Sequence, residues 1–562
     1  MTTTFHLEVG PDRLATLTFD APGKRVNVFS PEVLFELRDL VAELAKRRDI
    51  GVLVLLSGKD SNFIAGADVD MIADVTDPAV AEEGARLGQQ LFSAWNQLPF
   101  PTVAALRGTT MGGGTEIALA STWRVASDRD AVQIGLPEVK LGIVPGWGGC
   151  TRLPRVVGLA AALDMILTGK TVRAKQAFKM GLVDALVPDA QFLPLVRQFA
   201  LERIDKKGRP ARRTTLKDKL LEGNPLGRIL VFSQAKKATL AASKGHYPAP
   251  LRAIEVVKAG TGSLSRGLAA EAKAIGELAT SPIAKNLIHV FRLMEDNKRS
   301  PGLPGGEAVP VEAAVVLGAG VMGGGIGHLL VDKGDIATRL KDIAPAALAS
   351  GMAHAAELFE KQVRRRRMRP DERKRKLALL SPTLDDRGFG RADLVIEAVV
   401  EKLEVKQKVF ADTAAKVRAN TVLASNTSSL SIDAIGRDTP HPERVVGMHF
   451  FNPVDKMPLV DVIAGAKSAP WAVNTVFELT RRVGKTPVIV KDAPGFLVNR
   501  LLMFSLSESL WLLDEGVPPE AIDRAMKRWG MPMGPLELTE EVGIDVANKV
   551  AHILHDAFGD RL

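Results

Sequence analysis

Short apolar runs separated by helical patterns give the first part of the chain its character. The start predicts two strands, Phe5–Val9 and Leu14–Phe19, joined by a turn at Gly10-Pro11-Asp12, because apolar and polar residues alternate on both sides of the turn. Ile50–Leu56 and Pro101–Leu106 are continuous apolar runs, which is typical of strands buried on both faces. Helical patterns between these runs predict an α/β domain to about residue 190.

The pattern changes twice more along the chain. Residues 191–300 are charged and rich in Leu, Ala, Lys and Arg, which predicts helices, and Asn297–Gly306, with two Pro and three Gly, predicts a linker. A second α/β unit begins at a buried strand, and the pattern after Pro494-Gly495 is helical. Its expected buried strands are Ala313–Leu317, Leu394–Ala398, Val422–Ala424 and Val445–Met448. The expected domains are 1–190, a helical tail and linker over 191–305, 306–492 and a helical domain over 493–562.

Composition limits the class of protein. At about 100–200 residues per domain, 562 residues predict three to five domains. The hydrophobic fraction of 46% and the charged fraction of 25% indicate a globular chain and exclude a mostly disordered one. The single cysteine, Cys150, excludes an internal disulfide and a cysteine-rich metal site, so we expect a reducing, cytoplasmic compartment and no bound metal. No signal peptide or membrane helix is expected.

Positive charge is concentrated in one segment. The chain carries a formal net charge of +9, and residues 361–376 contain ten basic and two acidic side chains. Such a run is typical of a solvated helix face, and the absence of interleaved aromatic residues argues against nucleic-acid binding. Attraction for the phosphates of coenzyme A or for acidic lipid is the alternative.

The strand Ala313–Leu317 leads directly into a glycine fingerprint. Gly318 permits a tight turn, Gly320 lets the backbone approach a pyrophosphate, and Gly323 allows close packing of helix and strand. Asp342 follows Gly323 by nineteen residues, at the end of a second expected strand, where it can accept a hydrogen bond from a ribose hydroxyl. An acid there would repel a 2′-phosphate, so the pattern predicts a site for NAD rather than NADP.

A second motif follows the nucleotide pattern. Ser425–Ser429 and Gly447–Pro453 place His449 at the end of an apolar strand, bracketed by Phe and Asn-Pro. Oxidation of an alcohol requires a base for the hydroxyl proton, and neutral imidazole suits that task near pH 7. A lone histidine in such a position is more often structural, so both interpretations stand on this pattern alone.

The first half contains residues suited to an oxyanion. Three consecutive glycines precede Glu116 and an expected helix over Glu116–Trp123, so free amides at a helix start could hold a developing negative charge. The segment Phe63–Asp68 could supply a second donor, and Glu138 lies in a turn fixed by proline. Two carboxylates beside an oxyanion hole are what hydration of an enoyl thioester needs. Each glutamate by itself is more often a solvated surface residue.

The segments FIAGAD, MGGGTE, GLPEVKLGIVPGWGG and TRLPR together resemble the crotonase (enoyl-CoA hydratase/isomerase) family over residues 5–190. The resemblance implies a crotonase (ββα spiral) fold. It implies Glu116 and Glu138 as the catalytic pair, with the oxyanion held by the amides of Ala65 and Gly113, near Gly66. Trp147 either lines the acyl pocket or packs at a helix start. Cys150 is expected to be structural.

The segments GAGVMGGGI, IEAVVE, SNTSSL, GMHFFNPV and DAPGFLVNR resemble the L-3-hydroxyacyl-CoA dehydrogenase family from residue 313 onward. The resemblance implies a Rossmann domain followed by an all-α domain. It implies His449 as the catalytic base. The residues implied to hold the substrate are Ser428, Asn452 and Asn499, and those implied to contact NAD are Met322, Asp342, Glu401 and Lys406.

Two departures from the family pattern concern the dehydrogenase half. The family pairs its histidine with a glutamate twelve residues later, whereas this chain has Asp461, whose side chain is shorter by one methylene. The chain also ends where the first of two helical modules of the family would finish. Asp461 is expected to orient His449, and the dehydrogenase half is expected to lack the last module.

The order of the two halves resembles the α subunit of the multifunctional fatty-acid β-oxidation enzyme. The resemblance implies hydration of trans-2-enoyl-CoA to L-3-hydroxyacyl-CoA, followed by NAD-dependent oxidation to 3-ketoacyl-CoA. It implies an oligomer and a 3-ketoacyl-CoA thiolase partner, with no nucleic acid and no integral membrane segment. The alternative is a hydratase whose weakened second half serves NAD binding or thiolase docking.

Overall fold

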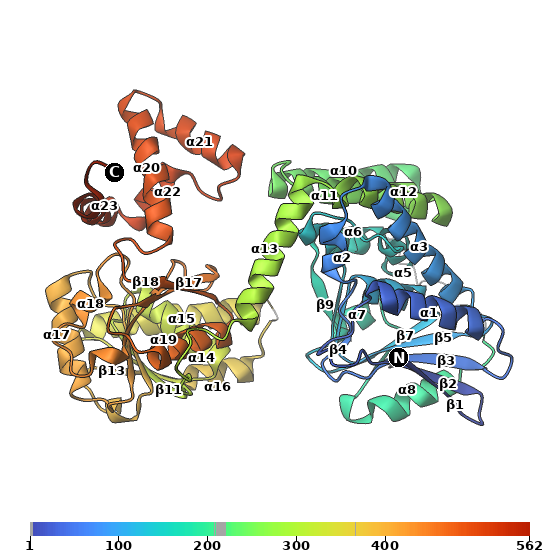
Figure 1. The fold of residues 1–562 in the computed structure, drawn as a ribbon, viewed down its shortest axis with the longest axis horizontal. Helices are drawn as coiled ribbons and strands as arrows, with labels where there is room; N and C mark the ends of the chain where they lie inside the picture. The colour runs from blue at the N-terminus through green and yellow to red at the C-terminus, as the bar shows by residue number, and fades with distance from the viewer. Residues whose placement is uncertain (1–3, 207, 209–220, 366, 562) are drawn as a thin grey trace. The chain divides into compact units, whose positions relative to one another are not determined.

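The computed structural model describes residues 4–206, 208, 221–365 and 367–561 and divides into two compact units, Met1–Arg292 and Leu293–Leu562. The first unit runs from blue to green in Figure 1 and the second from green to red. Within the described ranges, no helix is long and apolar enough to cross a membrane.

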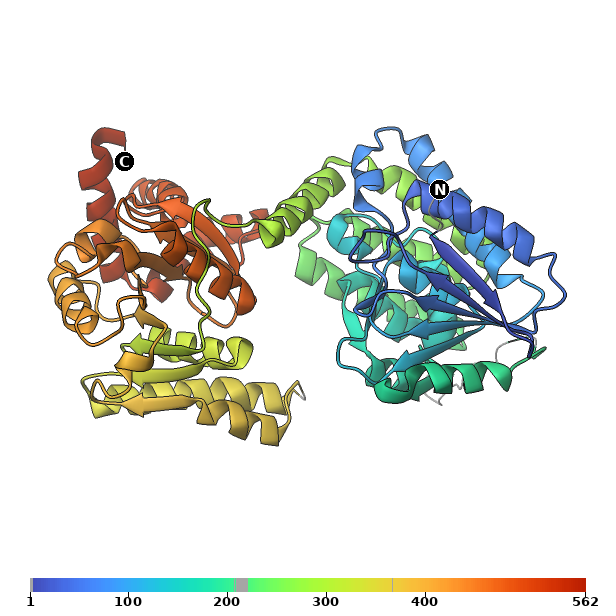
Figure 2. The same ribbon diagram turned by 60° about the horizontal axis from the view of Figure 1, so that its bottom comes forward.

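The first unit is built on a six-stranded sheet in the order β1-β2-β3-β5-β7-β10, in which only β1 is antiparallel to its neighbour. Its strands are β1 (Phe5–Val9), β2 (Leu14–Phe19), β3 (Val52–Ser57), β5 (Thr102–Leu106), β7 (Trp123–Ser127) and β10 (Ala185–Val187). The continuous apolar runs form β3 and β5, as predicted, because both faces are covered. Helix α8 (Phe192–Leu201) covers one face through Phe192, Val196 and Ala200 (Figure 2).

A second, four-stranded sheet makes the fold a spiral. Its order is β4-β6-β8-β9, and its strands are β4 (Asn62–Ile64), β6 (Thr109–Met111), β8 (Gln133–Gly135) and β9 (Thr171–Arg173). β4, β6 and β8 each follow a strand of the larger sheet, so the chain steps from one sheet to the other. The helices of this region are α1 (Pro31–Leu44), α2 (Val69–Asp74), α3 (Pro78–Asn96), α4 (Gly113–Ala120), α5 (Gly149–Val157), α6 (Leu159–Thr168) and α7 (Ala174–Lys179). This is the expected crotonase architecture.

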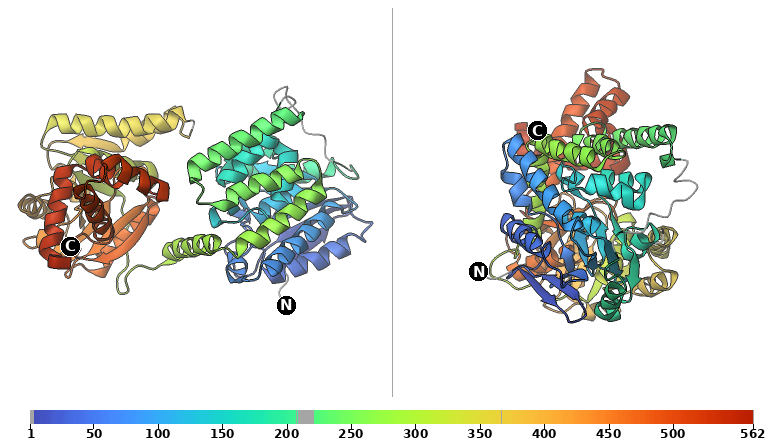
Figure 3. Two further views of the ribbon diagram at one scale, coloured as in Figure 1. Left: turned by 90° about the horizontal axis from the view of Figure 1, so that it is seen from above. Right: turned by 90° about the vertical axis from the view of Figure 1, so that its right-hand side faces the viewer.

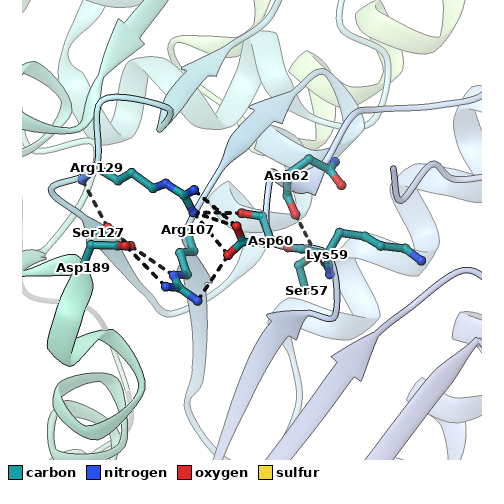
Figure 4. Close-up of polar contacts among 8 residues, drawn as sticks. All are labelled: Ser57, Lys59, Asp60, Asn62, Arg107, Ser127, Arg129 and Asp189. Carbon is teal, nitrogen blue, oxygen red and sulfur yellow. Dashed lines mark hydrogen bonds and ion pairs between the residues drawn. The ribbon is translucent and has the colours of Figure 1, made fainter. Parts of the chain in front are cut away.

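A polar network joins the loops at the carboxyl ends of the larger sheet (Figure 4). Arg107, directly after β5, pairs with Asp189 at 3.0 Å and with Asp60 at 3.5 Å. Asp60 also pairs with Arg129 at 3.2 Å, and Ser127 donates a hydrogen bond to Asp189 at 2.7 Å. These contacts fix the turns that follow β3, β5 and β7.

The segment after residue 224 packs into the first unit. Its helices are α10 (Pro225–Ser243), α11 (Pro248–Gly260), α12 (Leu264–Ala279) and α13 (Pro282–Arg299), and α10, α11 and α12 lie side by side in Figure 3. Ala253, Val257, Ala274 and Leu278 belong to the same buried core as the crotonase helices. The segment expected as a tail and linker therefore contributes core to this unit, because its helices carry apolar faces.

The second unit is built on an eight-stranded sheet in the order β13-β12-β11-β14-β15-β16-β17-β18. The first six of these strands are mutually parallel, β17 runs antiparallel to β16, and β18 is parallel to β17. The bounds are β11 (Ala313–Leu317), β12 (Ala337–Lys341), β13 (Leu380–Thr383), β14 (Leu394–Glu397), β15 (Val422–Ser425), β16 (Val445–Phe450), β17 (Leu459–Ala464) and β18 (Thr486–Lys491). The order 3-2-1-4-5-6 of the parallel strands is the Rossmann arrangement that the sequence predicted.

Helices cover both faces of this sheet and complete the unit. They are α14 (Val321–Gly334), α15 (Pro345–Arg364), α16 (Pro370–Ala378), α17 (Leu403–Ala414), α18 (Ile432–Ile435), α19 (Pro470–Arg482), α20 (Val498–Asp514), α21 (Pro519–Trp529), α22 (Pro535–Val542) and α23 (Ile544–Phe558). The basic run lies on α15, α16 and their connection, where Arg364, Arg365 and Lys374 are exposed; its residue 366 lies outside the described residues. Lys376 is the exception, since it is buried and pairs with Asp335 at 3.1 Å.

Candidate active sites

Glu116 lies in the first turn of α4, with its side chain 2% exposed. The helix begins at Gly113, three residues earlier than predicted. Gly112 precedes it with a φ of +51°, a conformation that favours glycine. A Cβ on Gly113 would lie 2.7 Å from the Trp147 ring, so only glycine fits there. The Oε1 oxygen of Glu116 accepts hydrogen bonds from the Trp147 amide at 2.7 Å and the Gly149 amide at 2.8 Å.

Glu138 faces the same cavity from a different element. It begins a short 3-10 helix, η1 (Glu138–Leu141), directly after Pro137, where the sequence predicted a turn fixed by proline. Its Oε2 oxygen is buried and has no hydrogen-bond partner among the residues that the structure describes. Glu116 and Glu138 both line one cavity, so the fold brings the two predicted carboxylates together.

The two carboxylates differ in their proton affinity. Burial raises the pKa of Glu116 to about 7, while the amides of Gly149 and Trp147 and the charge of Arg152 oppose this rise. Burial, followed by the negative charge of Glu116, raises the pKa of Glu138 well above its ordinary value. Two amides stabilise the charged form of Glu116, whereas the buried Oε2 of Glu138 has no donor among the described residues, so the arrangement favours the charge on Glu116 and the proton on Glu138.

The prediction that the Ala65 amide holds the oxyanion is wrong. The Ala65 amide donates to the carbonyl of Asn27 at 2.8 Å, because the segment after β4 pairs with the loop before α1, and it cannot also hold an oxyanion. Ala67 lies two residues further on, lines the cavity, and its amide has no acceptor among the described residues. Gly113, the first residue of α4, also has no intrahelical acceptor for its amide. Gly66, with a φ of +115°, makes the bend between Ala65 and Ala67.

The cavity itself has a volume of about 800 Å³ and is mostly apolar. Its walls come from α1, α2 and α3 on one side and from α12 on the other, through residues such as Leu34, Ile72 and Ile275. Trp147 lines it and packs edge-on against Phe29 and Phe92, with ring centroids 6.0 and 5.5 Å away. Both interpretations of Trp147 are therefore correct at once. Cys150 is buried in the core, as expected of a structural residue.

Sequence reasoning missed one buried acid of this site, Glu271 on α12. Its side chain is wholly buried, and it accepts a hydrogen bond from the Gly148 amide at 2.7 Å. The signal that could have found it is its position on the apolar face of α12, four residues after Gly267 and three before Ala274, both buried.

The glycine loop of the second unit has the shape that a dinucleotide needs. Gly318 has a φ of +96°, and a Cβ on it would lie 2.5 Å from the carbonyl oxygen of Ala398. A Cβ on Gly320 would meet no atom within 4 Å, so this backbone is open to an approaching pyrophosphate. A Cβ on Gly323 would overlap the carbonyl oxygen of Gly318, so the helix packs closely on the turn.

Asp342 lies at the end of β12 beside this loop, as predicted. Its Oδ2 oxygen accepts the Ala319 amide at 2.8 Å, which ties the acid to the loop while the side chain stays half-buried. Ile343, which sequence reasoning did not consider, is 91% exposed next to it. Met322, in the first turn of α14, is half-buried. These residues fit NAD, with the acid toward a ribose and the helix start toward a phosphate.

His449 and Asp461 are direct cross-strand partners on β16 and β17. The His449 ring is 4% exposed, and its Nδ1 lies 3.3 Å from Oδ2 of the wholly buried Asp461. The shorter acid therefore still reaches the ring, because the antiparallel register places the two residues face to face. The rings of Phe451 and Phe496 lie 4.4 and 5.9 Å from the imidazole and fix its orientation.

The expected substrate residues lie at two strand ends. Asn499, from α20, donates to the carbonyl of Ser428 at 2.8 Å, so the helical domain contacts the segment after β15. Asn452 follows β16 and is exposed. Glu401 accepts the hydroxyl of Thr427 at 2.6 Å and the amide of Ser428 at 2.9 Å, which places it in the same group of residues.

Lys406, expected to contact NAD, pairs with two carboxylates. Its side chain is wholly buried, and its Nζ lies 2.7 Å from the buried Glu397 and 3.2 Å from Glu401. An ammonium group so enclosed is stable only because carboxylates pair with it. Lys406 therefore fixes the position of Glu401 through this ion pair. Glu397, missed by sequence reasoning, also accepts the Ser425 hydroxyl at 2.6 Å and completes this network.

Three family models match successive parts of the chain. Enoyl-CoA hydratase/isomerase matches residues 10–224, the NAD binding domain of 3-hydroxyacyl-CoA dehydrogenase matches residues 313–493, and the C-terminal domain of that dehydrogenase matches residues 495–562. The matches fall on the spiral fold, on the Rossmann sheet and on helices α20–α23. The resemblances of both halves are thereby confirmed.

Solved structures of similar proteins include two 3-hydroxybutyryl-CoA dehydrogenases and FadB2. 3-Hydroxybutyryl-CoA dehydrogenase from Escherichia coli K12 is 40% identical, over 44% of this chain and 53% of that enzyme, with a TM-score of 0.43. The chain thus spans about half the length of the E. coli enzyme. (S)-3-Hydroxybutyryl-CoA dehydrogenase PaaH1 from Ralstonia eutropha and FadB2 from M. tuberculosis are each 34% identical, over 45% of this chain and 89% and 90% of their own chains, with TM-scores of 0.43.

The carboxylate pair lies in the part matched by a lyase family, and the His449–Asp461 pair lies in the part matched by an oxidoreductase family. The first unit matches the enoyl-CoA hydratase/isomerase family model over residues 10–224, and in its second unit the chain belongs to the 3-hydroxyacyl-CoA dehydrogenase family.

Proposed function

We propose that the first unit adds water to trans-2-enoyl-CoA thioesters through Glu116 and Glu138. Ionised Glu116 takes a proton from water, the resulting hydroxide adds to C3, and protonated Glu138 gives a proton to C2. The amides of Ala67 and Gly113 hold the negative charge that develops on the thioester oxygen. The apolar cavity beside the carboxylates takes the acyl chain.

The second unit oxidises the L-3-hydroxyacyl-CoA that hydration forms. His449 accepts the proton of the 3-hydroxyl group, and Asp461 stabilises the charged ring and fixes its orientation. NAD supplies the hydride acceptor when it is bound at the glycine loop. Ser428, Asn452 and Asn499 hold the substrate, and Gly318, Gly320, Gly323, Met322 and Asp342 hold the cofactor, with Glu401 at the border between the two.

The single observation that supports this proposal most strongly is one apolar cavity that holds two carboxylates of raised pKa and two amides without an acceptor among the described residues. The alternative, a hydratase with a disabled second half, depends on Asp461. The 3.3 Å approach of Asp461 to His449 favours a working dehydrogenase instead.

Because both proposed sites lie on one chain, substitutions in one protein test the two sites independently. Glu138→Gln is expected to reduce hydration of a four-carbon trans-2-enoyl-CoA by about 10²- to 10⁴-fold and to spare NADH formation from added L-3-hydroxyacyl-CoA. His449→Ala is expected to do the reverse, and each variant serves as the folding control for the other. If both folded variants lost both activities, the assignment of separate sites would be wrong.

We further propose a 3-ketoacyl-CoA thiolase as partner, in an oligomeric complex, and a cytoplasmic location. The product of the second step is a 3-ketoacyl thioester, and its chemistry allows cleavage of the bond between C2 and C3 as the next reaction. Size-exclusion chromatography of the chain with and without a thiolase tests the partner and the oligomeric complex. Elution at the sizes of the separate proteins would contradict the complex.

A further inference from the structure

A third buried carboxylate lies next to the hydration site, and the proposed mechanism does not use it. Glu271 projects from α12 and accepts three hydrogen bonds from the start of α5. The Gly148 amide donates to Oε2 at 2.7 Å, the Thr151 amide donates to Oε1 at 2.7 Å, and the Thr151 hydroxyl also donates to Oε1. Both carboxylate oxygens are therefore fully engaged with one short turn.

The same turn orients Glu116. Its amides are divided between the two acids: Trp147 and Gly149 donate to Glu116, whereas Gly148 and Thr151 donate to Glu271. These amides precede or begin α5, so none of them has an acceptor inside the helix. A carboxylate on each side of the turn thus fixes the directions of all four amides.

Close packing of α12 makes this contact possible. A Cβ on Gly267, one helical turn before Glu271, would lie 2.6 Å from the Thr151 side chain, so α12 reaches α5 only because glycine stands there. Arg152 supports the turn from the other side, donating to the Trp147 carbonyl at 2.8 Å. Burial of an acid at this position is costly unless its hydrogen bonds are satisfied, and here they are.

The charges around Glu271 are few and defined. Burial, followed by the charge of Glu116, raises the pKa of Glu271 to about 8, and the charge of Glu271 in turn contributes to the raised pKa of Glu138. The titratable and charged groups that act on it from the surrounding elements are Glu116, Glu138, Cys150, Arg152 and Arg155.

We infer that Glu271 is a positioning residue for hydration, which holds the turn 147–151 so that the Trp147 and Gly149 amides point at Glu116. This inference rests on the proposed hydratase function of Glu116. It has a structural consequence, because Glu271 lies beyond residues 10–224, which match the hydratase family. Helix α12 is then part of the hydration site rather than a connection between domains.

The test replaces one carboxylate oxygen with a donor. In Glu271→Gln the side-chain NH₂ must face the amide of Gly148 or Thr151, so the turn loses an acceptor at nearly constant volume. With a four-carbon trans-2-enoyl-CoA, kcat is expected to fall about 10- to 100-fold with little change in KM. The ascending limb of the pH profile is expected to move up by about half a pH unit or more, because Glu116 loses amide donors.

Two further variants separate positioning from a loss of folding. Glu277→Gln makes the same chemical change on the exposed side of α12, where the side chain is 47% exposed, and should leave hydration unchanged. Thr151→Val removes only the hydroxyl that donates to Glu271. Its loss in kcat should be smaller and not additive with that of Glu271→Gln, since both act through one turn.

Each outcome decides a different claim. If the wild type hydrates the substrate and Glu271→Gln has the same kcat and pH profile, the role of Glu271 alone is overturned. Wild-type protein without hydration would overturn the proposed function and this inference with it. If Glu271→Gln does not fold, Thr151→Val decides: a reduced kcat with a shifted ascending limb supports the inference, and an unchanged profile overturns it.

Discussion

The Oε2 oxygen of Glu138 is buried and has no hydrogen-bond donor among the described residues. Such an unpaired polar atom lowers the stability of the fold, so stability alone does not explain it. A raised pKa means that the folded state binds the Glu138 proton more tightly than the unfolded state does. The free energy of unfolding therefore falls as pH rises from the unfolded pKa of about 4.3 toward the folded value. The site is thus arranged for a protonated acid near neutral pH.

Glu138→Gln should stabilise the first unit as well as inactivate it. The neutral amide removes the need to bury a charge, so the variant should gain about 1 kcal/mol or more over the wild type at pH 8.5 and less at pH 6. Urea unfolding followed by tryptophan fluorescence at several pH values measures the difference. A gain that stays constant with pH would contradict the assignment of a raised pKa to Glu138.

Asp461 is the buried carboxylate of the second site. Its Oδ2 faces His449 at 3.3 Å, while its Oδ1 has no partner among the described residues. Asp461→Asn keeps the shape and removes the charge that stabilises the imidazolium, so kcat for 3-hydroxyacyl-CoA oxidation should fall about 10²-fold or more. The Kd for NAD, measured by calorimetry, should stay constant because Asp461 lies away from the glycine loop. An unchanged kcat would show that Asp461 is only structural.

At the scale of elements, α3 shapes the acyl cavity through small side chains. Ala81, Gly84, Ala85 and Gly88 all line the cavity and recur at helical spacing. They are not equivalent: a Cβ on Gly88 would overlap the Trp147 ring, whereas a Cβ on Gly84 would meet no atom within 4 Å. Gly88 is therefore required by packing, and Gly84 is open toward the cavity.

Gly84→Leu should restrict the length of the acyl chain without disturbing the fold. The new side chain enters open space in the cavity, so kcat/KM for a long-chain enoyl-CoA should fall about tenfold or more. The value for the four-carbon substrate should change little, and Gly84→Ala is the matched control because its methyl group occupies far less of the cavity. Equal losses for both chain lengths would show that Gly84 does not face the acyl chain.

At the scale of the whole molecule, the division into units does not follow the predicted domains. The chain separates within α13, at Arg292, and α10–α12 share the core of the crotonase helices. The sequence placed this segment in a tail and linker because its charge pattern differs from that of the first α/β region. Its apolar faces find a partner only when the chain folds back on α3 and α5.

A shortened chain tests this division. A protein ending at residue 300 retains α11, α12 and Glu271 and should hydrate enoyl-CoA with kcat/KM within about threefold of the whole chain, since it keeps its own core. A protein ending at residue 245 lacks those helices and should lose hydration. Circular dichroism reports whether each folds, and full activity of the shorter protein would remove α12 from the site.

The sequence by itself determined the elements and most of the chemistry. The strands Phe5–Val9, Leu14–Phe19 and Ala313–Leu317 form as predicted, because alternation and continuous apolar runs depend on local burial. Glu116, Glu138 and His449 could be named from motifs whose residues suit the chemistry, and Asp461 from the resemblance to the dehydrogenase family.

Only the tertiary structure decided which backbone amides and buried charges complete each site. Ala65 and Ala67 differ by two residues in one glycine-containing turn, and the pairing of Ala65 with Asn27 determines which amide remains free. Lys406 and Glu271 are ordinary charged residues of helices until packing encloses them beside Glu397 and Thr151. Thr151 lies 120 positions from Glu271, whereas Glu397 lies only nine positions from Lys406. In both cases, as in the choice between Ala65 and Ala67, packing decides the role, and no local pattern in the sequence records it.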